Sequence, residues 1–182
     1  MTTNTYSRAA HDLGLSAWFG GTLANAVSLN AAAAQADTSS GTGAVANAGW
    51  DRWTPVNLGA IALHLAGSVG QLVGNSERLK AQSGVGTMAL TKTGLTAAAL
   101  GATAYSRTLG KRVSQHGAVP VESGTEPTAT TPKAVANAQR QLKVLQWVIP
   151  VLTGGLVVVS AFAGEQQRAS EVKKGLLSRL TP

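Results

Sequence analysis

A stretch of 21 residues without Lys, Arg, Asp or Glu, at positions 55–75, constrains the fold of this chain most strongly. It reads PVNLGAIALHLAGSVGQLVGN, and charged residues flank it at Arg52 and Glu77. An uncharged apolar run of this length is typical of a helix that crosses a lipid bilayer. Thr54 as a cap and Pro55 as the first helical residue predict where this helix begins, because proline is tolerated at that position.

Two spacings predict that this helix is buried in a bundle rather than surrounded by lipid. Polar residues recur every seven positions and form one stripe: Asn57, His64 and Gln71. Small residues recur every four positions and form a packing face: Ala62, Ala66, Gly70 and Gly74. A face of small residues lets the backbone of a second helix approach closely.

The low content of charged residues supports the membrane interpretation. Lys, Arg, Asp and Glu make up 13% of the 182 residues, about half of the roughly 25% that is usual in soluble domains. The apolar segments use Ala and Gly more than Leu and Ile, so the mean hydropathy is only +0.09. The chain has no cysteine, which excludes disulfides and thiolate metal sites.

The net charge of +7 indicates lipid rather than nucleic acid as a partner. The basic residues lie at segment ends and in loops, and aromatic residues are only 4% of the chain, too few to form a platform for stacking bases. Attraction to anionic lipid headgroups accounts for this charge. We therefore expect the lipid bilayer, and other membrane proteins or a second copy of the chain, as partners, and no nucleic acid.

Three further segments complete the predicted fold class, an all-α integral membrane four-helix bundle with up-down topology. The spans are expected at about 13–34, 55–75, 87–106 and 144–164, with a flexible linker at about 117–131. Pro150 should bend the last span, and the stem of Lys92 in the third span can extend outward to the interface. Amphipathic extensions are expected after the third span, at 133–143, and at the C-terminus, at 165–182.

The expected location is the plasma membrane, as a multi-pass protein. The first span lacks a clear release site near its start, which favours a retained signal anchor over a cleaved signal peptide. Eight basic residues fall on the side of the termini and seven on the other, and the single basic residue of the first long loop favours cytoplasmic termini. Trp50, Trp53 and Trp147 are expected to act as anchors at headgroup level, the first two at the end of a loop at 37–53.

Three stretches together resemble a family of uncharacterised small four-helix membrane proteins of high-GC Gram-positive bacteria. They are SAWFGGTLANAVSLN, NAGWDRWTPVNLGAIALHLAG, and AQRQLKVLQWVIPVLTGGLVV followed by GEQQR. The resemblance implies a membrane bundle and no particular activity. The segment HDLGLSAWFGG also resembles the first helix of copper-resistance-type membrane proteins, in which a histidine precedes Trp-x-Gly-Gly.

His64 is the ionisable residue expected near the bilayer midplane, which makes it a candidate functional residue. Three interpretations remain open: a neutral imidazole paired with Asn25, Gln71 or a Ser/Thr hydroxyl, a ligand of a cofactor such as a single-histidine haem, or a site of proton or solute passage. A bis-histidine haem with His11 is not expected, because helix rise separates the two residues in depth by more than about 10 Å.

The sequence lacks the parts of a recognisable active site. It has no Gly-rich phosphate loop, no paired carboxylates within a span and no serine nucleophile beside a base, so we expect no catalytic residues, no metal site and no enzyme. The predicted function is that of a structural or interaction partner in the plasma membrane. The alternatives are a binder of a redox cofactor or small molecule that uses the His64 face, and a soluble helical protein with a single anchor at 144–164.

Overall fold

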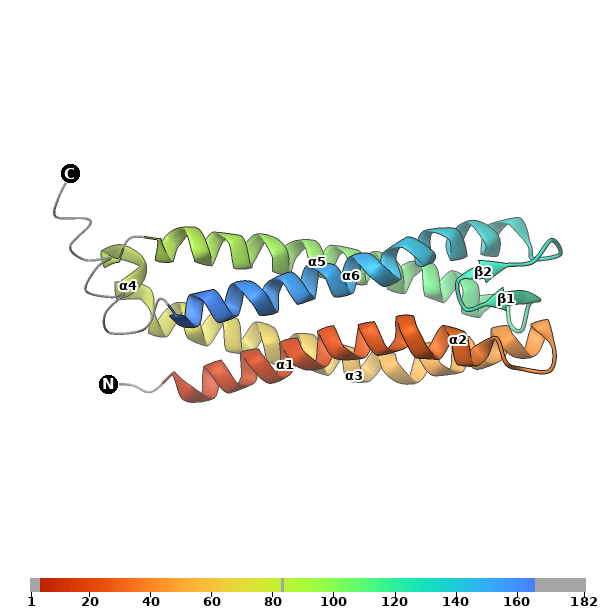
Figure 1. Ribbon diagram of the computed structural model, residues 1–182, viewed down its shortest axis with the longest axis horizontal. Coiled ribbons are helices and arrows are strands. Elements are labelled where there is room, and N and C mark those ends of the chain that lie inside the picture. Colours follow the sequence, from red (N-terminus) through yellow and green to blue (C-terminus); the bar gives the residue numbers. More distant parts are fainter. Residues whose placement is uncertain (1–3, 83, 166–182) are drawn as a thin grey trace.

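In residues 4–82 and 84–165, which the computed structural model describes, the chain forms four long helical rods joined by short connections (Figure 1). The first rod consists of α1 (Thr5–Ala24), the π-helical turn η1 (Asn25–Leu29) and α2 (Asn30–Ala33). The other elements follow in chain order: α3 (Ser39–Gly74), α4 (Ser76–Ala81), α5 (Val85–Gln115), the strands β1 (Val121–Ser123) and β2 (Glu126–Pro127), and α6 (Lys133–Glu165).

The chain reverses direction after each rod, so α1 begins and α6 ends at the same end of the molecule (Figure 1). The rods pack as two pairs, α1 along α3 and α5 along α6, and α1 also contacts α6. By contrast, α3 and α5 touch very little. The protein is therefore closed on three sides and loosely packed along the seam between α3 and α5.

Glycines bring α1 and α3 into backbone contact. A Cβ atom at Gly14 would lie 2.4 Å from the backbone nitrogen of His64, and a Cβ at Gly67 would lie 2.2 Å from the backbone nitrogen of His11. Any side chain at either position would collide with the facing helix, so this close approach depends on glycine.

The expected start of the second helix at Thr54 is wrong. Helix α3 begins at Ser39, where the Thr38 hydroxyl accepts a hydrogen bond from the Gly41 amide at 3.0 Å, and Pro55 lies inside the helix. The glycines that favoured a loop at 37–53 serve instead as contact points, since Gly43 faces the backbone of Val119 and Gly49 faces the Leu29 side chain. Tertiary packing thus holds as a helix a segment whose composition favours a loop.

The expected flexible linker at 117–131 contains a small antiparallel hairpin of β1 and β2. Val121 on β1 is buried, and β1 packs against α3. The hydroxyls of Thr128 and Thr131 both donate to the Pro120 carbonyl and close the connection back to α6. The segment is therefore a structured cap over one end of the bundle.

Helix α6 begins directly after Pro132, as the sequence predicts, and the extension at 133–143 is a continuous part of it. Of the described helices, α3 and α6 are long and apolar enough to cross a membrane by length and composition, whereas α1 and α5 do not meet that measure. The expected amphipathic helix at 165–182 lies outside the described residues, except for Glu165.

The interior of the bundle is mixed, and many large apolar side chains face outward. The buried polar residues of the rods include His11, Thr22, Asn30, Asn57, His64, Gln139 and Thr153, and large apolar side chains such as Trp18, Leu109 and Leu156 are buried with them. On the outer surface, Leu58 is 66% exposed and Val151 is 71% exposed, with many other aliphatic residues beside them. A water-soluble bundle would carry charged and polar residues on this outer face.

Candidate functional site

His11 and His64 form a buried pair between α1 and α3. They are 1% and 0% exposed, and their ring centres are 4.5 Å apart. The indole ring of Trp18 completes the cluster, with its centre 6.0 Å from that of His64. Each histidine lies opposite a glycine of the other helix, so the contacts at Gly14 and Gly67 place the two rings together.

The expected separation of His11 and His64 in depth is therefore wrong. It depends on helix starts near residues 13 and 55. The helices begin at Thr5 and Ser39, so they overlap over a much greater length. Antiparallel packing of these longer helices brings His11 to the level of His64.

The hydrogen bonds of the pair place a proton on Nδ1 of both rings. His64 Nδ1 donates to the His11 carbonyl at 3.4 Å, which leaves Nε2 to accept from the Thr96 hydroxyl, also at 3.4 Å. His11 Nδ1 is 2.7 Å from a carboxylate oxygen of Asp12 and donates to it. His11 Nε2 is buried and has no partner within the described part of the chain.

The pair leaves no room for a haem between the rings. Two imidazoles bound to one metal at about 2 Å each have ring centres on the order of 6 Å apart, whereas these centres are 4.5 Å apart. The backbones at Gly14 and Gly67 already touch, so the helices would have to separate to admit a macrocycle. The bis-histidine site is excluded by packing, not by depth. His64 is fully enclosed as well, so a single-histidine haem would require the helices around it to move apart.

The predicted polar stripe lies on the inner side of α3, but it is not a hydrogen-bonded chain. Asn57 is buried, and Gln71 has a buried amide nitrogen without a partner among the described residues. Neither Gln71 nor Asn25 bonds to His64, whose side-chain partner is Thr96 on α5. The hydroxyl partner was among the expected alternatives.

The predicted small-residue face divides in two. Gly70 and Gly74 face α1 at the side chains of Ser7 and Asn4. Ala62 and Ala66 are exposed and take no part in this contact. The residues of α3 that contact α1 follow the mixed three- and four-residue spacing of two packed helices. They include Ala60 and Gly67 in place of Ala62 and Ala66.

The three tryptophans expected as anchors have different environments. Trp53 packs its ring over Gly21 of α1, and Trp147 on α6 is 48% exposed. Trp50 Nε1 donates to Asn30 Oδ1 at 3.1 Å, and Asn30 Nδ2 donates to Gln146 Oε1 at 2.7 Å. This polar network ties α2, α3 and α6 together at one level of the bundle.

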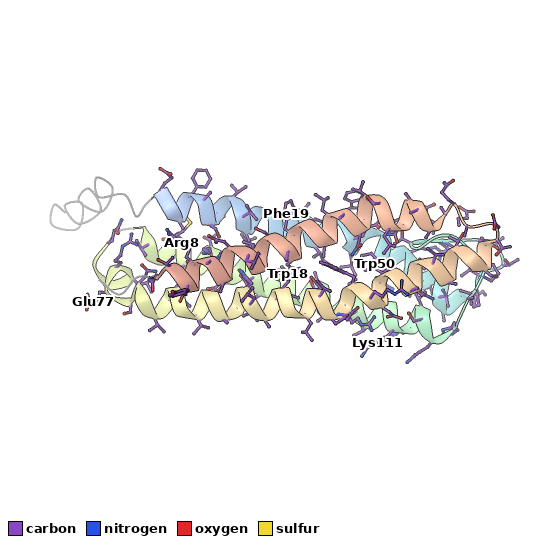
Figure 2. The ribbon with its side chains drawn as sticks, turned by 90° about the horizontal axis from the view of Figure 1, so that it is seen from below. Arg8, Trp18, Phe19, Trp50, Glu77 and Lys111 are labelled. Carbon is purple, nitrogen blue, oxygen red and sulfur yellow. The ribbon has the colours of Figure 1, made fainter. Side chains whose placement is uncertain are left out.

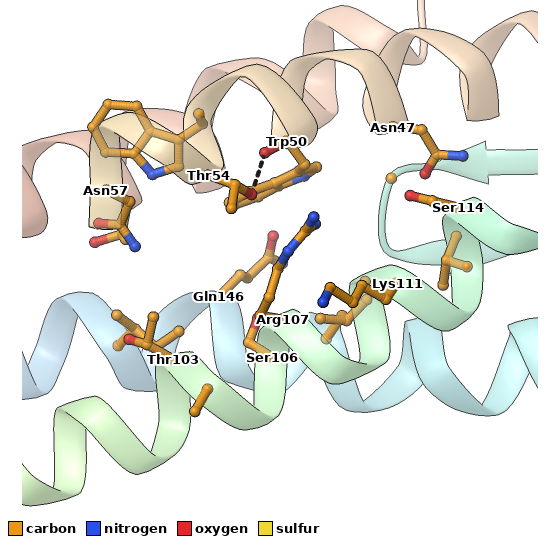
Figure 3. Close-up of a pocket in the computed structure, with 18 of the residues that line it drawn as sticks. Asn47, Trp50, Thr54, Asn57, Thr103, Ser106, Arg107, Lys111, Ser114 and Gln146 are labelled. Carbon is orange, nitrogen blue, oxygen red and sulfur yellow. Dashed lines mark hydrogen bonds between the residues drawn. The ribbon is translucent and has the colours of Figure 1, made fainter. Parts of the chain in front are cut away.

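Two cavities follow one another along the seam between α3 and α5. The first, of about 520 Å³, is lined by the Trp50 side of α3 and by Arg107 and Lys111 of α5 (Figure 3). The second, of about 360 Å³, is lined by Gln71 and Arg78 on one side and Lys92 on the other. Leu100 lines both cavities, so they meet at its side chain.

Sequence reasoning did not single out Asn30, Gln146, Arg107 or Lys111. One signal was available for the last two: Arg107 and Lys111 are four residues apart, which places both on one face of a helix. The network of Asn30 gave no such signal, because its partners lie 20 and 116 positions away.

Comparisons with known protein families, with curated proteins and with solved structures find no match to the chain.

Proposed function

We propose that this chain is a multi-pass integral membrane protein whose four helical rods all enter the bilayer, and that it acts as a structural or interaction partner there. The observation that carries the proposal is the exposure of large aliphatic side chains along α3 and α6, together with histidine, asparagine and threonine side chains buried between the helices. In water the exposed aliphatic surface of α3 and α6 would promote aggregation, whereas in lipid it is the favourable arrangement.

Charged residues mark the two boundaries of the proposed membrane segment. At one level Arg107 Nη1 donates to Asp51 Oδ1 at 3.0 Å, and Lys143 of α6 pairs with Glu126 of the hairpin. At the other level, Asp12 on α1 lies next to His11. Lys92 on α5 lies one turn before Thr96, the residue whose hydroxyl contacts His64. Figure 2 shows the same division, with Arg8 and Glu77 towards one end, Lys111 towards the other, and Trp18 and Phe19 between them.

The distance between these levels fits a bilayer. The 14 residues at 93–106 of α5 carry no charge, and at about 1.5 Å each they cover roughly 21 Å. Lys92 and Arg107 flank them, and side chains of this length can extend the distance between the two charged ends towards the roughly 30 Å of the hydrocarbon core. Trp147 lies at one of these boundaries and is exposed, as an interfacial aromatic residue should be.

The bundle is longer than the bilayer is thick. The 36 residues of α3 extend about 54 Å at 1.5 Å each. The hairpin and the adjoining helix ends, including the cluster of Leu109, Val113, Val135 and Ala138, then project from the membrane on the side opposite the start of α1. We place the start of α1 in the cytoplasm, because three basic residues at 78, 80 and 92 surround the connection on that side.

Single introduced cysteines test this arrangement with no background labelling of the protein, because the chain has no cysteine of its own. One exposed position on each rod serves as a probe: Gly20→Cys, Leu63→Cys, Ala98→Cys and Val158→Cys. Val45→Cys on α3, exposed at the projecting end, is the matched control. In native membrane vesicles opened to both sides, an aqueous maleimide should label the control, and it should label the four probes only after denaturation in SDS.

Two outcomes would contradict the proposal. Equal labelling of all five positions in native vesicles would mean that no rod is in lipid. Protection of Val158→Cys alone would support a soluble helical protein with a single anchor at 144–164.

A further inference from the structure

The seam between α3 and α5 is the most open part of the bundle. Its two cavities lie end to end and share Leu100, so together they form one groove along the length of the proposed membrane segment. The walls near Leu100 are apolar, with Ile61 and Ile149 on one side of it and Leu65 and Ala97 on the other. The groove therefore has an apolar middle.

Cations lie at both ends of this groove. The first cavity ends at Arg107 and Lys111, and the second ends at Lys92 and Arg78. Among the described residues that line the two cavities there is no Asp or Glu. Each end therefore complements an anion, although one carboxylate outside the walls, that of Asp51, binds Arg107.

The cations of the first cavity are available to a ligand. Figure 3 shows Arg107 extending from α5 towards Trp50 and Thr54 on α3, with the Lys111 side chain beside it. Arg107 uses Nη1 to bind Asp51, which leaves other donors of its guanidinium free to face the cavity. Within the described residues, Lys111 and Lys92 have no hydrogen-bond or ion-pair partner.

The spacing of the two cationic ends matches that of two membrane leaflets. Lys92 and Arg107 are 15 positions apart on α5, which is about 22 Å along the helix axis. Side chains as long as those of Lys and Arg can bring their charged ends nearer to the two surfaces of a hydrocarbon core about 30 Å thick. Leu100 lies about midway between them, where acyl chains from opposite leaflets would meet.

We propose that the α3–α5 seam binds two anionic phospholipids, one from each leaflet. The phosphate of one lies against Arg107 and Lys111, the phosphate of the other lies against Lys92, and their acyl chains meet at Leu100. The inference rests on the proposed insertion in the membrane. The absence of acids from the described walls favours a phosphate over a second protein helix, which would need acidic residues at both levels to match these cations.

Native mass spectrometry of the purified protein tests the inference, with phosphatidylglycerol or phosphatidylcholine added in a mild detergent. The intact chain should retain two phosphatidylglycerol molecules and lose phosphatidylcholine readily. The double variant Arg107→Gln/Lys111→Gln should retain one, as should Lys92→Gln. Arg112→Gln is the matched control, because Arg112 is an exposed cation of α5 outside both cavity walls, and it should retain two.

A steric variant separates lipid binding from simple loss of charge. Ala104 lines the first cavity and is exposed, so Ala104→Trp should displace the lipid of that cavity while every cation remains. Glycerol phosphate, which has the anionic group without acyl chains, should not compete. As a check that does not depend on mass, phosphatidylglycerol should raise the melting temperature of the intact chain and of Arg112→Gln more than that of the double variant.

Equal retention of the two lipids, or loss of lipid from Arg112→Gln equal to that from the double variant, would overturn the inference. Competition by glycerol phosphate would reduce the site to one for free phosphate. A dimer of the intact chain in the native mass spectrum that is absent from the Ala104→Trp variant would show that a second copy fills the seam. If the cysteine probes are protected, any of these results contradicts only the proposed lipid binding in the seam. If the probes are not protected, the proposed insertion in the membrane is contradicted as well.

Discussion

Replacing Gly67 with alanine should separate α1 from α3 and disrupt the buried histidine pair. The added Cβ would lie 2.2 Å from the backbone nitrogen of His11 and 2.5 Å from the carbonyl oxygen of Ser7. Ordinary contacts at such an atom begin at 3.4 Å, so the helices must move apart by about 1 Å at this level. Both obstacles are backbone atoms of a helix, and neither can rotate away.

The magnitude follows from two opposing effects. Forcing an extra carbon into a packed contact costs about 1–3 kcal/mol, and the upper end applies where backbone must move. Alanine in place of glycine within a helix returns about 1 kcal/mol. We therefore expect Gly67→Ala to lower the free energy of unfolding by about 2 kcal/mol.

Gly59→Ala on the same helix is the matched control. In the described structure no heavy atom lies within 4 Å of its Cβ position, so only the gain in helix propensity of about 0.5–1 kcal/mol remains. The assay is unfolding in mixed micelles of mild detergent and SDS, followed by far-ultraviolet circular dichroism. The two variants should shift the SDS midpoint in opposite directions, and equal midpoints would refute the assigned contact between α1 and α3.

The other glycines of α3 should give a graded response. Gly70 meets the Ser7 hydroxyl, a side-chain atom with limited room, and Gly74 meets the Asn4 amide, which can turn away at the start of α1. Gly70→Leu should therefore destabilise the protein more than Gly74→Leu. A Gly74→Leu variant less stable than Gly70→Leu would contradict the antiparallel register of α1 against α3.

Four further outcomes follow. His64→Leu should keep the fold and cost less than about 2 kcal/mol, because both of its hydrogen bonds are 3.4 Å long; loss of helicity in circular dichroism would contradict this. Gln71→Leu should raise the SDS midpoint, since the Gln71 amide nitrogen is buried without a partner among the described residues, and a lowered midpoint would mean that this nitrogen has one. Asn30→Leu should lower the free energy of unfolding by about 2–3 kcal/mol, because it leaves Trp50 and Gln146 unpaired. The double variant Asn30→Leu/Gln146→Leu should lose less than the sum of the two single variants, whereas strict additivity would contradict the hydrogen bond between these residues. Titration with hemin should give the same spectrum for His64→Ala as for the intact chain, and a Soret shift confined to the intact chain would restore the cofactor interpretation.

The sequence predicts which segments are helical better than it predicts where they begin. The apolar runs identify α3 and α6, the two described helices that are long and apolar enough to cross a membrane. The sequence misplaces the start of α3 because Gly41, Gly43 and Gly49 are weak helix formers, and the contacts that hold Gly43 and Gly49 helical come from residues 20 or more positions away. Local propensity carries no information about those contacts.

The same limit applies to the candidate sites. The seven-residue spacing places Asn57 and His64 on the inner side of α3, where they lie. It does not identify Thr96 as the partner of His64, nor does it show that α3 avoids α5 and leaves a groove. Those facts depend on which helices pair, and backbone contacts at Gly14 and Gly67 determine that pairing.

The π-helical turn at 25–29 makes the first rod tolerant of a change in length at a single place. A π turn holds one residue more than the α-helical turn it replaces, whereas each residue of an ordinary α-helix rotates the chain by about 100°. Deleting one residue at 25–29 would therefore leave a continuous α-helix and keep Asn30 on the side that faces Trp50 and Gln146, whereas deleting one residue within α1 would turn Asn30 by about a quarter of the circumference relative to the start of the rod. In a natural relative, a gap of one position at 25–29 is therefore compatible with the same network between α2, α3 and α6, whereas a gap of one position within α1 would change which side chains join these helices.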